Sequence, residues 1–273
     1  MTVARDVLDA KAVSLSEYLD ICSRYVTGLD KDVATRAVAA VLASGSGKPF
    51  SEADMAPMRR LEKQWYGSIM SGTPDYSVYG DPYYFVDVWN CWRTYSRKYL
   101  REVQSPKSFG NRSIVSALGN ISTVLDLGCG FGYTTAALKQ IFHTATVTGT
   151  NLPGTAQYEM SSKLGRDRGF TITANHENLQ GTDLVWATEY FEHFPAPIEH
   201  LEHVLEHTTP RFLLIANTFT SPAIGHFETY LHKGVRYAGK QVSIGFNKTL
   251  RYRGYEKVKT KCWNNRPMLW RKL

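Results

Sequence analysis

Val124-Leu125-Asp126-Leu127-Gly128-Cys129-Gly130-Phe131-Gly132-Tyr133-Thr134-Thr135 is the stretch that decides the fold of this chain. An apolar, β-favouring run leads into three glycines at alternate positions, and Ala136-Ala137-Leu138 then continues as a helix. Glycine is needed where a backbone turns sharply and where a ligand must lie against main chain that carries no Cβ. The stretch therefore predicts a strand, a tight ligand-binding turn and the start of a helix.

The spacing of these glycines separates two classes of binding loop. A dinucleotide fingerprint has the spacing G-x-G-x-x-G and holds a pyrophosphate at the helix N-terminus. Here the spacing is G-x-G-x-G, and Asp126 stands two residues before the first glycine. A carboxylate there would repel a pyrophosphate, but it suits a ligand that carries an ammonium and a sulfonium. The charge placement therefore disfavours a nicotinamide dinucleotide.

The loop resembles motif I of the Rossmann-like (class I) S-adenosylmethionine-dependent methyltransferases. The resemblance implies S-adenosylmethionine as the cofactor and methyl transfer as the activity. It also implies that a group of residues from this loop binds the cofactor, namely Asp126, Gly128, Gly130, Phe131 and Gly132.

The amino-acid composition limits the classes of protein to which the chain can belong. A hydrophobic content of 43% with 12% aromatic residues is typical of a globular chain. The sequence has neither an apolar run long enough to span a membrane nor a signal peptide, so we expect a soluble, cytoplasmic protein without a membrane partner. Four scattered cysteines form no CxxC pair, which argues against a zinc site or a disulfide framework.

The net charge of +7 is distributed unevenly along the chain. Residues 1–110 carry a net charge of +1, residues 111–232 carry −5, and residues 233–273 carry +11 from 12 Lys and Arg against 1 acidic residue. A segment this basic could bind a polyanion, and it predicts nucleic acid as a partner. The alternative is a solvated basic face, and composition leaves both open.

Hydrophobic periodicity divides the chain near residue 110. Residues 1–110 are predicted to form a helical extension that acts as a lid or binds substrate, with helices around Leu15–Val26 and Val33–Leu42, after Pro57, and from Pro82 to about Val103. Residues 111–273 alternate strands with helices, which indicates a parallel sheet. The predicted strands are 122–127, 144–150, 170–174, 183–187 and 212–217, followed by a hairpin of 254–261 and 267–272. The predicted fold is therefore α/β: a mostly parallel Rossmann-like methyltransferase sheet with a closing β-hairpin and an N-terminal helical extension.

Ligands of open α/β sheets bind beyond the carboxyl ends of the strands. After the second strand, the methyltransferase resemblance implies an acidic residue that accepts the ribose hydroxyls, but this chain has Asn151 and Leu152. Asn151 can accept a hydrogen bond without bringing a charge. After the third strand, Asn175 and His176 occupy the place implied for binding adenine.

The segment after the fourth strand, Glu189-Tyr190-Phe191-Glu192-His193, has the pattern E-x-x-E-H. This pattern resembles that of the small-RNA 3′-terminal 2′-O-methyltransferases and the ubiquinone-biosynthesis O-methyltransferases. The resemblance implies that Glu189, Glu192 and His193 are catalytic and that, with His226, they hold a divalent metal ion that activates the acceptor hydroxyl. The alternative is a metal-free site in which His193 is a general base or a pocket wall.

The absence of two motifs narrows the choice of the atom that is methylated. The chain has no Asn/Asp-Pro-Pro-Tyr/Phe tetrad for amino methylation and no Pro-Cys pair for C5 methylation of cytosine, so oxygen methylation is favoured. Three hypotheses stay open: a methyltransferase of nucleic acid or a nucleotide, a methyltransferase of a small hydroxylated metabolite, and a non-catalytic binding module with this fold.

Overall fold

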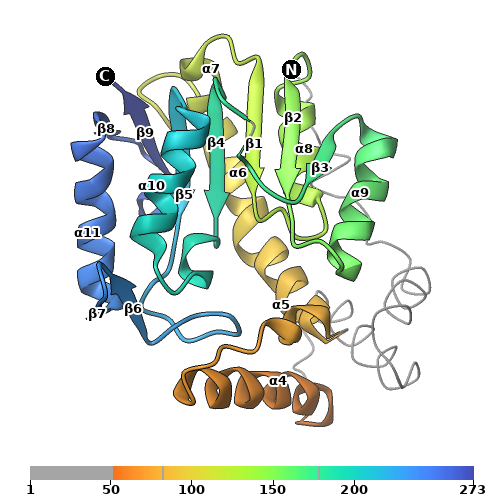
Figure 1. The fold of residues 1–273 in the computed structure, drawn as a ribbon. Helices are drawn as coiled ribbons and strands as arrows, with labels where there is room; N and C mark the ends of the chain where they lie inside the picture. Colours follow the sequence, from red (N-terminus) through yellow and green to blue (C-terminus); the bar gives the residue numbers. More distant parts are fainter. Residues whose placement is uncertain (1–51, 82, 178) are drawn as a thin grey trace.

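The computed structural model describes residues 52–81, 83–177 and 179–273 (Figure 1). A seven-stranded sheet with the order β3-β2-β1-β4-β5-β9-β8 forms its centre. The strands are β1 (Thr123–Leu127), β2 (Thr146–Thr150), β3 (Thr171–Thr173), β4 (Leu184–Thr188), β5 (Phe212–Ala216), β8 (Tyr255–Val258) and β9 (Met268–Lys272). The helices predicted around Leu15–Val26 and Val33–Leu42 lie outside the described residues.

Strand pairing confirms the predicted fold class. β1 pairs in parallel with β2 and β4, and the remaining neighbours β2–β3 and β4–β5 are also parallel. β9 runs antiparallel to both β5 and β8, so the last two strands form the predicted closing hairpin. Because β1 to β5 point the same way, their carboxyl ends meet at one edge of the sheet.

Helices cover both faces of the sheet (Figure 1). They are α4 (Glu52–Met70), α5 (Tyr84–Cys91), α6 (Arg97–Gln104), α7 (Ile114–Leu118), α8 (Tyr133–Ile141), α9 (Ala156–Arg168), α10 (Pro197–Thr208) and α11 (Gly239–Tyr252). The π-helical turn Trp92–Ser96 joins α5 to α6, so the helix predicted to begin at Pro82 is nearly continuous. Asp81 caps its start, since its Oδ1 accepts a hydrogen bond from the Tyr83 N–H at 2.8 Å.

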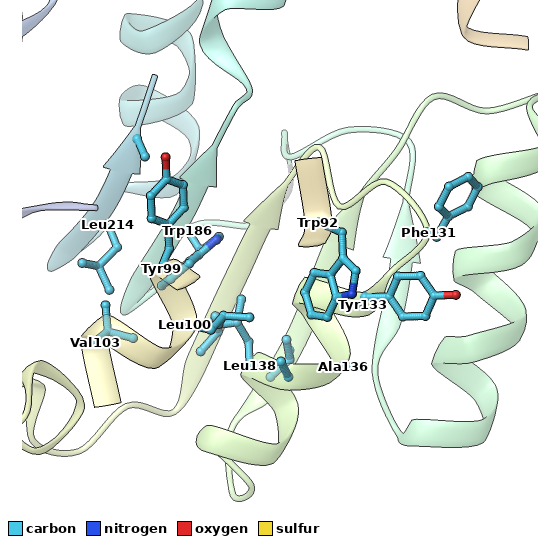
Figure 2. Close-up of a cluster of buried hydrophobic side chains, with 14 of the residues drawn as sticks. Trp92, Tyr99, Leu100, Val103, Phe131, Tyr133, Ala136, Leu138, Trp186 and Leu214 are labelled. Carbon is cyan, nitrogen blue, oxygen red and sulfur yellow. The ribbon is translucent and has the colours of Figure 1, made fainter. Parts of the chain in front are cut away.

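Successive side chains of a strand point to opposite faces of the sheet, so the strands contribute to two hydrophobic cores. On one face, Val124, Trp186 and Leu214 pack with α4, α6, α8 and α9, as Figure 2 shows around Tyr99 and Leu100. On the other face, residues from the same strands pack with α10 and α11: Leu125, Leu127, Val185, Ala187, Leu213 and Ile215. Each large side chain buried here stabilises the fold by roughly 1.5–3 kcal/mol, which fixes the register of the central strands.

One part of the fold was not predicted from the sequence. β6 (Thr229–His232) and β7 (Val235–Ala238) form a separate antiparallel pair, and α11 follows them directly. None of the helices in residues 52–81, 83–177 and 179–273 combines the length and hydropathy that a membrane span requires.

Candidate functional site

A cavity of about 1210 Å³ lies at the carboxyl ends of β1 to β5. Its walls come from the loops after these strands and from residues 76–96, which belong to the predicted N-terminal extension. The boundary predicted at residue 110 stays a prediction, but side chains from both of its sides line this cavity.

The glycine loop adopts a conformation that other residues would not tolerate. Gly128 and Gly130 have φ angles of 67° and 55°, in the left-handed region that favours glycine. A Cβ on Gly128 would lie 2.5 Å from Cδ2 of Tyr190, and one on Gly130 would lie 3.0 Å from Cγ1 of Val88. Both glycines line the cavity, as does Phe131, whereas Gly132 caps the start of α8. The loop therefore offers bare main chain to a ligand.

Asp126 lies at the end of β1 as predicted and lines the cavity. Its Oδ2 accepts a hydrogen bond from Oγ1 of Thr135 at 2.7 Å. Burial disfavours the charged form and raises the pKa of Asp126 to about 7. A cationic group bound beside it would stabilise the carboxylate.

The side chain of Asn151, which follows β2, already forms hydrogen bonds within the protein. Nδ2 of Asn151 donates to the Gly130 carbonyl at 2.6 Å, and its Oδ1 accepts from the Leu152 N–H at 2.9 Å. Asn151 thus ties the glycine loop to the segment after β2, while both Asn151 and Leu152 line the cavity. Their role toward ribose stays a prediction.

After β3, Asn175 and His176 also line the cavity. His176 is buried, and its Nε2 has no hydrogen-bond partner among the described residues. Burial and the nearby His203 and His207 lower the pKa of His176 to about 4, so its ring is neutral at neutral pH. A buried polar atom without a partner is costly, which makes this nitrogen a candidate contact for a ligand.

The two glutamates of the E-x-x-E-H segment have different surroundings. Glu189 lines the cavity, with Oε1 accepting from the Tyr99 hydroxyl at 3.2 Å. Glu192 is fully buried behind the cavity wall, and its Oε1 accepts from the Thr218 N–H at 2.7 Å. With its amide oriented to donate, Asn217 lies 3.1 Å from Oε2 of Glu192. Only Glu189 is therefore available to a ligand.

The two carboxyl groups also affect each other's ionisation. Burial raises the pKa of Glu189 and, together with the charge of Glu189, raises that of Glu192 well above its ordinary value. Two buried carboxyl groups that interact in this way disfavour ionising together.

His193 lies on the cavity wall between two contacts. Its Nδ1 is 3.0 Å from the Tyr79 hydroxyl, and its ring meets that of His226 edge-on with centroids 4.8 Å apart. Burial lowers the pKa of His193 to about 3, so the ring is neutral. The structure thus brings His226 beside His193, as the sequence predicted.

The described residues give no support to the predicted metal site. No group of three or more His, Cys, Asp or Glu side chains within residues 52–81, 83–177 and 179–273 is arranged to hold a metal ion. Glu192 is directed away from the cavity, and its Oε1 accepts from the Thr218 N–H. Nδ1 of His226 donates to the Ser221 carbonyl at 2.8 Å, which leaves its Nε2 as the ring nitrogen that could meet a ligand. The set of Glu189, Glu192, His193 and His226 therefore stays a prediction.

Two residues of the site carried no signal in the sequence. Tyr79 comes from the 3-10 turn Tyr76–Gly80 and approaches His193 from 114 residues away. Arg266 comes from the turn between β8 and β9, where its Nη1 donates to Oγ1 of Thr218 at 2.9 Å and the side chain lines the cavity. One of the predicted basic segment's 12 cations therefore belongs to the site.

The rest of the basic segment, residues 233–273, lies elsewhere. It includes α11, β8 and β9, which occupy the edge of the sheet farthest from β3 (Figure 1). Some of its arginines form ion pairs there: Arg253 with Glu202 and Glu206, and Arg271 with Glu256. Among the described residues, Arg266 is the one Lys or Arg side chain of the cavity wall.

Comparison with known proteins comes from a family model and from solved structures. The model described as "Methyltransferase domain" matches residues 92–251. No protein of curated function matches the sequence significantly. Mitomycin 7-O-methyltransferase MmcR is 11% identical with a TM-score of 0.48, over 98% of this chain and 74% of its own.

Two further structures are similarly distant. The plantazolicin methyltransferase BpumL in complex with SAH is 16% identical with a TM-score of 0.41, over 60% of this chain and 59% of its own. A StiE O-MT fragment is 18% identical with a TM-score of 0.41, over 71% and 61%. This chain also covers less than two thirds of the chain matched in a fibrillarin/Nop5p complex, at 64%. At such distances these structures carry no argument about a substrate.

Proposed function

We propose that this chain, which belongs to the family described as "Methyltransferase domain", transfers the methyl group of S-adenosylmethionine to a hydroxyl oxygen of a small molecule. The observation that carries the proposal is the cavity of about 1210 Å³ that joins the glycine loop to Glu189 and His193. Its volume exceeds that of a typical single-ligand pocket, so donor and acceptor have room together.

The first end of the cavity fits the donor. Asp126 offers a carboxylate to a cationic ligand, and Gly128 and Gly130 offer main chain without side chains. His176 offers a buried nitrogen without a partner to the adenine side, where Asn175 is a second candidate contact. We assign the ribose side to Asn151 and Leu152, which line the same end.

The other end supplies the chemistry of the acceptor. When bound, S-adenosylmethionine supplies the methyl group as an electrophile on its sulfonium, and the electron pair of the broken carbon–sulfur bond stays on sulfur. The acceptor oxygen loses its proton as it bonds to the methyl carbon, and we assign this proton to Glu189. A raised pKa makes Glu189 a better base than an ordinary carboxylate. Nε2 of His193, the ring nitrogen not bonded to Tyr79, would orient the hydroxyl.

The walls of the site and the place of the basic segment favour a small acceptor over a nucleic acid. Side chains from residues 76–96 form one wall of the cavity, and Val88 from this segment lies against Gly130. Most of the basic segment is at the sheet edge away from β1 and β2, so it would not bind a polymer next to the donor. Methylation of nucleic acid would be expected to weaken steeply with salt because phosphate contacts release counterions.

The test measures S-adenosylhomocysteine released from S-adenosylmethionine with a panel of phenols, catechols, hydroxy acids, their amides and nucleosides. We expect turnover of a small hydroxylated member, unchanged within about twofold between low and moderate salt. Glu189→Gln should lower turnover by roughly 10²–10⁴-fold with little change in donor affinity by calorimetry. Glu228→Gln, which alters an exposed carboxylate after β5, is the matched control.

Two results would count against the proposal. Binding of S-adenosylmethionine without turnover of any hydroxyl acceptor would leave a non-catalytic binding module. Turnover confined to nucleic acid, lost steeply as salt rises, would assign the acceptor to a polymer.

A further inference from the structure

Arg266 stands at the acceptor end of the cavity with part of its hydrogen-bonding capacity unused. Its Nη1 donates to Oγ1 of Thr218 at 2.9 Å, and its positive charge partly offsets the rise that burial causes in the pKa values of the nearby Tyr99 and Glu189. A guanidinium has five N–H donors in a planar fork, so several are left for a ligand in the cavity that Arg266 lines.

No carboxylate of the described residues lies within ion-pair distance of Arg266. The other arginines that form ion pairs here do so with Asp or Glu at 4 Å or less, as Arg253 does with Glu202 and Glu206. Glu189 lies beyond ion-pair distance, yet close enough for the charge of Arg266 to act against the rise that burial causes in its pKa. The guanidinium is held by a neutral oxygen, the hydroxyl of Thr218 at 2.9 Å.

The cation and the base lie beside the same tyrosine. Tyr99 donates to Oε1 of Glu189 at 3.2 Å, and the charge of Arg266 acts on the pKa values of both Tyr99 and Glu189. A ligand that reaches both Arg266 and Glu189 must carry its hydroxyl and its anionic group close together. A carboxylate on the hydroxyl-bearing carbon, as in mandelate, or on the carbon next to it, as in salicylate, satisfies this requirement.

We infer that the acceptor is a small hydroxy acid whose carboxylate binds Arg266 while its hydroxyl meets Glu189, an inference that rests on the proposed function and specifies its substrate class. Planar carboxylates are the ligands that a guanidinium fork matches with two parallel hydrogen bonds. The charge of Arg266 would offset that of the acceptor carboxylate, as the cationic donor would offset that of Asp126.

The test compares acids with their neutral amides: salicylate with salicylamide, and mandelate with mandelamide. Calorimetry without donor measures binding, and release of S-adenosylhomocysteine measures turnover. We expect at least one acid to bind tenfold or more tightly than its amide and to be methylated preferentially. Arg266→Gln should abolish this preference and keep the affinity for S-adenosylmethionine. Arg271→Gln, which changes an arginine on the outer strands, should preserve the preference.

Separate outcomes identify which idea fails. If the amides are methylated as well as both acids, or if neither acid binds more tightly than its amide, the inference is overturned. The proposed function would still stand. Loss of donor affinity in Arg266→Gln with an unchanged preference for acids would assign Arg266 to the donor instead. Absence of turnover with every hydroxyl acceptor, despite donor binding, would overturn the proposed function itself.

Discussion

Replacing Gly128 by alanine tests how the glycine loop is built. The new Cβ would lie 2.5 Å from Cδ2 and 3.2 Å from Cε2 of Tyr190, so the aromatic ring would have to move. Overpacking of this kind costs about 1–3 kcal/mol. The φ angle of 67° adds roughly 1–2 kcal/mol of backbone strain for an L-residue. We therefore expect the variant to lose about 2–5 kcal/mol in its free energy of unfolding.

A second glycine separates the two contributions. Gly181 has a φ angle of 75°, but a Cβ there would meet nothing within 4 Å. Gly181→Ala should therefore lose only the backbone part, about 1–2 kcal/mol. Urea denaturation of both variants measures the difference, and calorimetry should show that Gly128→Ala alone weakens binding of S-adenosylmethionine.

A double-mutant cycle with Tyr190→Ala completes the measurement. Removing the ring removes the clash, so Gly128→Ala should cost about 1–3 kcal/mol less in the Tyr190→Ala background than in the wild type. Equal destabilisation by Gly128→Ala and Gly181→Ala, together with zero coupling to Tyr190, would refute the proposed packing of the loop.

Two other measurements follow from the titratable groups. Burial lowers the pKa values of His193 and His200 to about 3 from an ordinary value of 6.5, so their contribution to stability is complete above pH 6.5 and is lost as the pH falls toward 3. Thermal denaturation should therefore show a midpoint that falls on acidification, and less so in His200→Gln; an equal fall in both proteins would contradict the assignment. Because Glu192 is occupied by Thr218, we expect an excess of chelator to leave turnover within about twofold; a loss that added Mg²⁺ restores would bring back the metal hypothesis.

Local patterns made most of the fold predictable. From residue 122 to residue 217, strands alternate with helices, and the predicted strand ranges agree with the observed strands to within about two residues. The β6–β7 hairpin was missed because its strands have four residues each and only Tyr230 among them is fully buried, so they show no apolar alternation. In α11, buried Val242, Phe246 and Leu250 recur every four residues, a signal that the sequence did contain.

The residues of the site fall into two groups, according to how the fold brings them to the cavity. Asp126, Asn151, Asn175 and Glu189 lie at or just after the carboxyl ends of strands, and the parallel sheet brings these ends together. Contacts between distant segments, such as that of Arg266 with Thr218, depend on how the segments pack, which no local pattern encodes.

The two glutamates of the predicted metal site point in different directions for a local reason. Glu189 has a positive φ of 51°, and the 3-10 turn Phe191–His193 follows it. This turn directs Glu192 into the protein, where the Thr218 N–H satisfies it, while Glu189 remains in the cavity. Sequence spacing alone cannot distinguish the two directions.

The charges along the cavity predict which of the two ligands, donor or acceptor, binds at each end. Asp126 lies at one end, the glutamate pair lies between, and Arg266 lies at the other end. A cationic donor is attracted to Asp126 and repelled by Arg266, whereas an anionic acceptor experiences the reverse. Exchanging the two ligands would place like charges together at both ends, in a buried site where water screens them poorly. The same arrangement that selects an acidic acceptor would therefore also hold its hydroxyl, and not its carboxylate, toward Glu189.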